Sequence, residues 1–385
     1  MVNSLSVVRE VEYSGRCYCL AFHPQGDLIA TGCNKKLRIV RTATGAVERE
    51  VEHGGVVYAV AFNLQGDLIA TGCGDDKLRI VRTVTGAVEL EVEHGGAVVG
   101  VAFHPHYDFI ATASDDGKLR IIHTASGVVK REVEHGAWVE CVDFHPQGDL
   151  IATGSEDGKL RIVDTATGAV EHEVEHGALV LCVKFSPKGD LIAAGCSDWK
   201  LRGGKLRITR TASGAVEREV DCGNTVCSVA FHPQGDIIAI ASMDQKISII
   251  HVATGTVASE LRYPVIDVVF HPHGEFMAAS ACMNAQRMKL YSLAPPDGHA
   301  FAVPAGASVT AGVSRSGATL TTTGSANTFV ELGQRIVEEA LLAAQQGQLA
   351  DKDVVLATQQ RQLGELGRIA ASAAKFGVDT EENES

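Results

Sequence analysis

The phrase FHPQGDLIATG, residues 22–32, decides the fold because the chain repeats it. It returns as FNLQGDLIATG from Phe62, as FHPQGDLIATG from Phe144 and as FHPQGDIIAIA from Phe231. Its first phenylalanine marks seven copies, at Phe22, Phe62, Phe103, Phe144, Phe185, Phe231 and Phe270. Successive markers lie 40, 41, 41, 41, 46 and 39 residues apart, so the chain is built from a unit of about 41 residues.

Each unit divides into four short strands. Around Phe144 these read AWVECVDF, DLIATGS, KLRIVDT and AVEHEVE, with turns at 146–149, 156–158 and 165–168. Short β-rich segments between Gly- and Pro-containing turns favour antiparallel strands. One such sheet cannot bury both faces, whereas several sheets packed radially can. The pattern predicts an all-β fold, a seven-bladed β-propeller of four-stranded antiparallel blades over residues 1–293.

The N-terminus predicts how the ring closes. Residues 5–12, LSVVREVE, resemble the fourth strand of a unit, AVEREVE, with no first three strands before it. The seventh unit supplies only three good strands before Pro295. We therefore expect the N-terminal strand to complete the last blade, which removes open sheet edges.

Composition restricts the partners. The chain has 385 residues and a net charge of -13, which argues against non-specific binding to nucleic acid or anionic membranes. No apolar run reaches the ~18 residues that span a bilayer, and the N-terminus shows no secretory signal. These features predict a cytoplasmic or nuclear protein that binds neither membrane nor nucleic acid.

The ten cysteines predict buried, reduced thiols rather than a metal site. Several occupy equivalent positions of successive units. The closer pairs, Cys17 with Cys19 and Cys222 with Cys227, lack the paired CxxC spacing of zinc sites. We expect no metal and no cofactor.

The units resemble tryptophan–aspartate (WD) repeats over roughly residues 5–293. In that family a His nine residues before the marker aromatic, an Asp in the second turn, a Ser or Thr two residues before that Asp, and a Trp in the third strand form a buried hydrogen-bonded set. Ser114 and Ser155 fit the hydroxyl position. The His and Asp positions are both occupied in four units, by His53 and Asp75, His94 and Asp116, His135 and Asp157, and His176 and Asp198.

The tryptophan is the departure from the family pattern. The Trp-Asp position holds, for example, Val40-Arg41, Val81-Arg82 and Val163-Asp164, and both tryptophans lie elsewhere. The His and Asp side chains must therefore act without an indole. They could serve metal binding or acid–base chemistry, but their repetition favours structural staples, since an active site is normally built once.

The fourth strands predict an acidic belt around the rim. Alternation places Glu48, Glu50 and Glu52 on one face of residues 46–53. Third-strand cations such as Lys77, Arg79 and Arg82 are expected to pair with such glutamates across the strands. The belt is either a solvated edge that resists strand addition or a docking rim for a basic partner.

The C-terminal part differs in composition. Residues 294–327 are rich in Gly, Ala, Ser and Thr and predict a flexible linker. Residues 328–376 show helical periodicity in two segments, and residues 377–385 predict a disordered acidic end. The α-helical tail is expected either to bind a partner helix or self-associate, or to fold back on the propeller.

The resemblance implies a non-catalytic protein-interaction scaffold or adaptor, a rigid disc that docks proteins or peptides on a face or rim. One alternative is an enzyme with its site at the central channel. The other is a substrate-recruiting subunit of a ubiquitin-ligase-type complex. That interpretation depends on a Trp-Asp-x-Arg motif, and residues 163–166 lack its Trp and Arg. No catalytic motif is recognisable, so we expect no catalytic residues.

A docking surface is expected where the sevenfold symmetry breaks, in units one, five and seven. The non-repeated residues include Tyr107, Trp138, Trp199, Arg202, His271 and His273.

Overall fold

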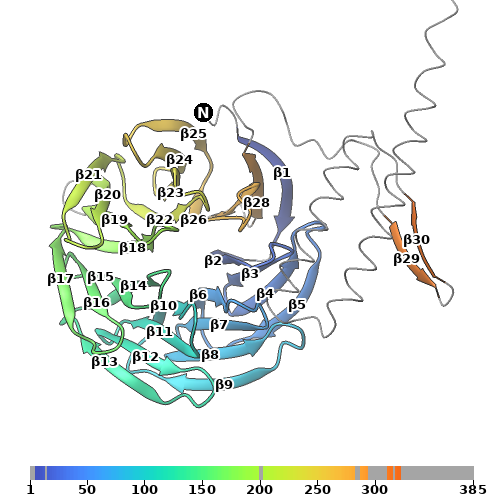
Figure 1. The fold of residues 1–385 in the computed structure, drawn as a ribbon, viewed down its shortest axis with the longest axis horizontal. Helices are drawn as coiled ribbons and strands as arrows, with labels where there is room; N and C mark the ends of the chain where they lie inside the picture. Colours follow the sequence, from blue (N-terminus) through green and yellow to red (C-terminus); the bar gives the residue numbers. More distant parts are fainter. Residues whose placement is uncertain are drawn as a thin grey trace, which may run out of the picture. The chain divides into compact units, whose positions relative to one another are not determined.

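Seven four-stranded antiparallel sheets surround a central channel in the computed structural model (Figure 1). It describes residues 5–13, 15–198, 203–281, 287–293, 310–314 and 317–321. No helix occurs among these residues, and so none that could cross a membrane. The predicted seven-bladed propeller is confirmed.

The strands of blades 1 to 4 follow one another in chain order, from the channel outward. Blade 1 consists of β2 (Cys17–Phe22), β3 (Leu28–Cys33), β4 (Lys36–Arg41) and β5 (Val47–Glu52). Blade 2 consists of β6 (Val57–Phe62), β7 (Leu68–Cys73), β8 (Lys77–Arg82) and β9 (Val88–Glu93). Blade 3 consists of β10 (Val98–Phe103), β11 (Phe109–Ser114), β12 (Lys118–His123) and β13 (Val129–Glu134). Blade 4 consists of β14 (Val139–Phe144), β15 (Leu150–Ser155), β16 (Lys159–Asp164) and β17 (Val170–Glu175).

The remaining blades keep this plan, except that the last takes its outer strand from the N-terminus. Blade 5 consists of β18 (Leu179–Phe185), β19 (Leu191–Asp198), β20 (Gly203–Arg210) and β21 (Val216–Asp221). Blade 6 consists of β22 (Val226–Phe231), β23 (Ile237–Ser242), β24 (Lys246–His251) and β25 (Val257–Arg262). Blade 7 consists of β26 (Val265–Phe270), β27 (Phe276–Ala281), β28 (Arg287–Leu293) and β1 (Leu5–Glu12).

The ring closes through β1, as the sequence predicts. Leu5 lies opposite Leu293 and Glu12 lies opposite Arg287 in an antiparallel ladder. Val11 is buried, and Glu10 forms an ion pair with Lys289 at 2.8 Å. Both ends of the propeller therefore meet in one sheet, which leaves no unpaired blade edge at the seam.

The core lies between blades rather than within them. Each of seven buried apolar clusters takes residues from two neighbouring blades. Ile80 of blade 2, for example, belongs to one cluster with Val98 and Ile110 of blade 3. Because each sheet is covered on both faces, the second and third strands of blades 1 to 4 bury nearly every side chain.

A second compact unit covers Ala300–Ser385. Its described part is a hairpin of β29 (Thr310–Ser314) and β30 (Gly317–Thr321), with Thr310 opposite Thr321. This hairpin lies within residues 294–327, which the composition predicts to be a linker. The helices predicted at 328–376 and the acidic end at 377–385 lie outside the described residues.

Candidate functional site

The four predicted histidines lie in the loops that enter blades 2 to 5, and three of them bond a threonine. His53 Nδ1 donates to the Val51 carbonyl at 3.0 Å, so its Nε2 accepts from the Thr71 hydroxyl at 2.9 Å. His94 and Thr112 repeat this bond at 3.0 Å, and His135 and Thr153 at 2.8 Å. Burial lowers the pKa of His135 to about 4 and also lowers the pKa of His53 and His94. These imidazoles are therefore neutral at pH 7.

Three of the four predicted aspartates bond an arginine of the third strand instead of the histidine. Asp75 accepts two bonds from Arg79, at 3.0 and 2.7 Å, and Arg79 Nε donates to Glu91 at 2.7 Å. The hydrogen bonds from Arg79 lower the pKa of Asp75. Equivalent ion pairs join Arg120 with Asp116 and Glu132, and Arg161 with Asp157 and Glu173. The family pattern implies one His–Asp set, whereas the structure divides it into a His–Thr pair and an Arg–Asp–Glu set.

Blade 5 lacks part of this arrangement. The threonine position is Ala194, and within the described residues His176 Nε2 has no hydrogen-bond partner although its ring is buried. The side chain of Asp198 lies outside the described part. Ser114 and Ser155 also differ from the family pattern, because their hydroxyls donate to the carbonyls of Gly96 and Trp138.

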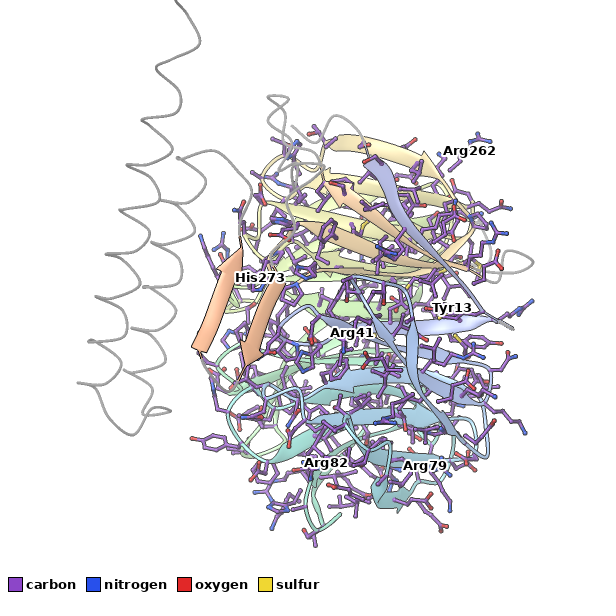
Figure 2. All side chains as sticks on the ribbon, turned by 90° about the vertical axis from the view of Figure 1, so that its right-hand side faces the viewer. Tyr13, Arg41, Arg79, Arg82, Arg262 and His273 are labelled. Carbon is purple, nitrogen blue, oxygen red and sulfur yellow. The ribbon has the colours of Figure 1, made fainter. Side chains whose placement is uncertain are left out.

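The rim glutamates are largely neutralised by the third strands, as expected. In blade 2, Lys77 pairs with Glu91 at 3.1 Å and Arg82 pairs with Glu89 at 2.7 Å. Figure 2 labels Arg41 of blade 1 and Arg79 and Arg82 of blade 2 on the side of the propeller that faces the viewer. Blades 1, 3, 4 and 5 repeat the Lys–Glu pair. A docked basic partner would have to compete with these cations.

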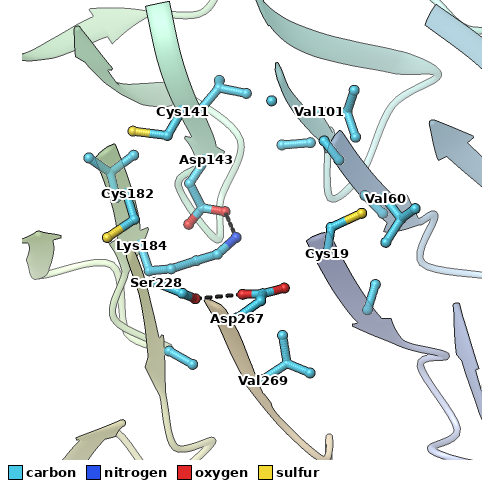
Figure 3. Close-up of a pocket in the computed structure, with 18 of the residues that line it drawn as sticks. Cys19, Val60, Val101, Cys141, Asp143, Cys182, Lys184, Ser228, Asp267 and Val269 are labelled. Carbon is cyan, nitrogen blue, oxygen red and sulfur yellow. Dashed lines mark hydrogen bonds and ion pairs between the residues drawn. The ribbon is translucent and has the colours of Figure 1, made fainter. Parts of the chain in front are cut away.

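The central channel contains a cavity that the sequence analysis did not describe. The innermost strands of all seven blades line a cavity of about 540 Å³. Most of its wall is small or apolar, for example Cys19, Val60 and Val101 (Figure 3). Polar side chains gather on blades 4 to 7, at Asp143, Lys184, Ser228 and Asp267 (Figure 3).

Asp143 and Lys184 form an ion pair between blades 4 and 5. Lys184 Nζ lies 2.7 Å from Asp143 Oδ1, and the Phe185 backbone N–H donates to Asp143 Oδ2 at 2.9 Å. Lys184 lies deep in the channel, yet 47% of its side-chain surface stays accessible. Burial acts to lower the pKa of Lys184, but the Asp143 carboxylate outweighs it and the pKa is raised. Lys184 is therefore a charged ammonium and not a nucleophilic amine.

Asp267 joins three blades at the seam of the ring. It accepts from the Ser228 hydroxyl of blade 6 at 2.6 Å and from the Leu20 N–H of blade 1 at 2.7 Å. Burial raises the pKa of Asp267 to about 6, against these bonds, which lower it.

Carboxylates also gather where β14 begins. Burial, reinforced by Asp115 and Glu156, raises the pKa of Glu140 to about 7. On blades 1 and 2 of the channel lining, Tyr18 and Tyr58 pack edge to face, with centroids 5.7 Å apart. Trp138, in the loop before β14, is 51% exposed.

The sequence reasoning missed the channel residues, although one signal points to them. The residue directly before the marker phenylalanine faces the channel. It is Ala in units one, two, three and six, but Asp143 in unit four and Lys184 in unit five. Comparing this position across the units would have singled out Asp143 and Lys184 as channel residues.

The described cysteines are all free thiols. Within the described ranges, no three His, Cys, Asp or Glu side chains converge as metal ligands would. Of the non-repeated residues, Tyr107 and Trp138 are exposed, and His271 is buried against Phe22 at the seam. Trp199 and Arg202 lie outside the described residues.

Comparison with known proteins assigns the family. Residues 16–292, most of the chain, match the family described as IFT122 first beta-propeller. No curated protein matches the sequence. The matched range runs from the residue before β2 almost to the end of β28, and therefore takes in all seven blades apart from β1. The chain belongs to the IFT122 first beta-propeller family.

Proposed function

We propose that this protein is a non-catalytic interaction scaffold or adaptor subunit that docks other proteins or peptides on its propeller. The observation that carries the proposal is the match of all seven blades to a propeller family, together with the closure of the ring by β1. A closed ring of sheets is a rigid platform, and its loops and rim are free to vary. Because fold alone does not dictate function, the proposal needs a binding test.

We also propose that the His and Asp positions are structural staples. The same bonds recur in blades 2, 3 and 4, at His53, His94 and His135 and at Asp75, Asp116 and Asp157. Their imidazoles are neutral and bonded on both nitrogens, so no free lone pair remains for a metal or a proton transfer. By position we propose the same role for His176 and Asp198, although within the described residues His176 keeps only the bond to the Val174 carbonyl.

The second candidate is an enzyme with its site in the channel, and the polar set on blades 4 to 7 is what favours it. Those side chains are already engaged, however. Asp143 binds the backbone N–H of Phe185, and Asp267 binds that of Leu20. Each bond joins neighbouring blades, which supports a stapling role and therefore the scaffold.

The proposal also covers the localisation, the excluded partners and the C-terminal helices, which rest on the sequence composition alone. We infer a cytoplasmic or nuclear protein that engages neither nucleic acid nor membrane. The predicted helices at 328–376 are proposed to bind a partner helix or to self-associate.

Affinity purification followed by mass spectrometry tests the scaffold. The full chain is compared with a chain that ends at Leu293. Proteins retained by both would place docking on the propeller, and proteins lost on truncation would assign docking to the C-terminal unit. If neither chain retains a partner above an unrelated propeller used as control, the scaffold proposal is wrong and a small-molecule or enzymatic role gains weight.

A further inference from the structure

The turn between the first and second strands of blade 3 differs in sequence from the same turn in the other six blades. The turn between the first and second strands carries a glycine with positive φ in six blades, at Gly26, Gly66, Gly148, Gly189, Gly235 and Gly274. A Cβ at Gly26 would lie 1.9 Å from His271 Nε2 of the preceding blade. Five of the six glycines face a histidine in this way, so a larger side chain is excluded there. Blade 3 nevertheless has Tyr107 at this position.

The preceding blade carries the matching change. Blade 2 has Asn63 where five of the other blades have histidine; blade 5 has Ser186. The Asn63 side chain turns back on its own turn, donating to Asp67 Oδ1 at 2.7 Å and accepting from the Leu68 N–H at 3.0 Å. Two linked departures, Asn63 and Tyr107, therefore make room for an aromatic side chain at one turn of the ring.

Tyr107 is presented to solvent on a fixed support. It is 68% exposed, and its ring lies against His104 with centroids 4.9 Å apart. His104 Nδ1 accepts the Tyr107 N–H at 3.0 Å, and His104 Nε2 donates to the Gly148 carbonyl at 3.1 Å. The imidazole is thus held between blades 3 and 4, and it orients the exposed phenol ring.

The charge of the rim reverses at the same blade. The second residue of the outer strand is Glu48, Glu89, Glu171 or Glu217 in blades 1, 2, 4 and 5, but Lys130 in blade 3. In blades 1, 2 and 5 this glutamate pairs with an arginine, as Glu89 does with Arg82. In blade 3 the arginine position is His123. Among the described residues, Lys130 forms no ion pair.

These departures converge on a groove of about 530 Å³ between blades 3 and 4. Tyr107, Phe109 and Lys130 line one wall, and Asp149 and Asp164 lie on the other. The two carboxylates are engaged within their own blade, Asp149 with His145 at 2.5 Å and Asp164 with the Thr167 N–H at 2.7 Å. Arg131 is also engaged, donating to the Ala166 carbonyl at 3.0 Å. Among the charged groups that line the groove, Lys130 is left without a partner within the described part of the chain.

We propose that this groove docks a short segment of a partner protein carrying an apolar or aromatic side chain next to a carboxylate. The apolar side chain packs on Tyr107 and Phe109, and the carboxylate pairs with Lys130. The inference rests on the proposed scaffold function and names its docking surface. That surface lies at unit three, not at units one, five or seven, where the sequence suggests that the symmetry breaks.

The test selects, from a displayed library of random short peptides, those that bind the intact chain. Tyr107→Gly and Lys130→Glu restore the residues that other blades carry at these positions, so both variants are expected to fold. Trp138→Ala removes an exposed aromatic elsewhere, and Lys188→Glu makes the same charge change at an exposed lysine of blade 5. These two serve as matched controls.

We expect enriched peptides to place Asp or Glu beside an apolar residue. Tyr107→Gly and Lys130→Glu should each weaken their binding roughly three- to tenfold, and the controls should not. Added salt should weaken binding to the wild-type chain more than binding to Lys130→Glu.

The groove proposal is wrong if no peptide is enriched, if the enriched peptides are basic, or if both variants bind the enriched peptides as tightly as the wild type does. The scaffold proposal is judged separately by the purification experiment. Partners retained there with equal strength by Tyr107→Gly and Lys130→Glu would reject this groove and leave the scaffold standing.

Discussion

At the scale of single residues, the Arg79 guanidinium binds Asp75 in a unit that lacks the tryptophan of the family pattern. Arg79 is only 6% exposed, and it satisfies Asp75 through its terminal nitrogens and Glu91 through Nε. The planar fork of arginine suits two carboxylates at once, which lysine could not match. Because the three groups come from the second turn, the third strand and the outer strand, one buried cation ties the outer half of the blade together.

Asp267 predicts a pH dependence of stability. Its pKa is about 6 in the folded chain, whereas an unfolded Asp titrates near 3.9. Between those values the folded state binds a proton that the unfolded state does not. The stabilisation from this group is therefore complete below about pH 4 and is lost as pH rises through about 6, by at most about 3 kcal/mol. Asp267→Asn removes this titration.

Urea unfolding of wild type and Asp267→Asn between pH 4 and 7 measures the effect. The wild type should lose stability relative to the variant as the pH rises, even though the carboxylates of the Arg–Asp–Glu sets shift both proteins in the opposite direction. The exposed Asp108→Asn serves as control and should follow the wild type. A difference between wild type and Asp267→Asn that stays constant with pH would refute the assignment.

At the scale of elements, β1 decides whether blade 7 is a complete sheet. Val11 faces the core between blades 7 and 1 and is 6% exposed, whereas Val8 on the same strand is 53% exposed. Val11→Glu buries an unpaired charge at the seam and should lower the free energy of unfolding by about 3 kcal/mol or more. Val8→Glu should change it by no more than about 0.5 kcal/mol.

Thermal and urea unfolding of the two variants provide the comparison. Similar, small losses for both would mean that β1 contributes little, and that blade 7 is stable with three strands. A large loss for Val11→Glu alone would show that the N-terminal strand holds the ring closed.

The elements were predictable because turn chemistry and strand alternation repeat with the period, so each unit supports the assignment of the next. The residue 5–12 strand was predictable for the same reason, by its likeness to AVEREVE. The pairing of third-strand cations with the rim glutamates was predictable from strand alternation. The bond from Arg79 to Asp75 was not, because the family pattern assigns Asp75 to the histidine, and only the folded turn places it beside a buried Arg79. Likewise, Asp143 and Lys184 become partners only when the ring places blade 4 beside blade 5.

At the scale of the whole molecule, the position of the core governs how the propeller unfolds. A linear array of repeats has two ends from which it can fray. Here each apolar layer joins two blades, and the layer containing Val11, Tyr13 and Met288 joins the last blade to the first. No blade keeps its core if a neighbour unfolds, so the seven blades should unfold together.

Ile80→Ala tests this cooperativity. Ile80 is 1% exposed in the layer between blades 2 and 3, and removing its side chain should lower the free energy of unfolding by about 2–5 kcal/mol. Ile208→Ala, in the layer between blades 5 and 6, is the matched variant on the other side of the ring. Each should shift one transition of the propeller, with equal calorimetric and van't Hoff enthalpies. An early separate transition in either variant would show instead that a group of blades unfolds by itself, and that closure through β1 does not couple the whole ring.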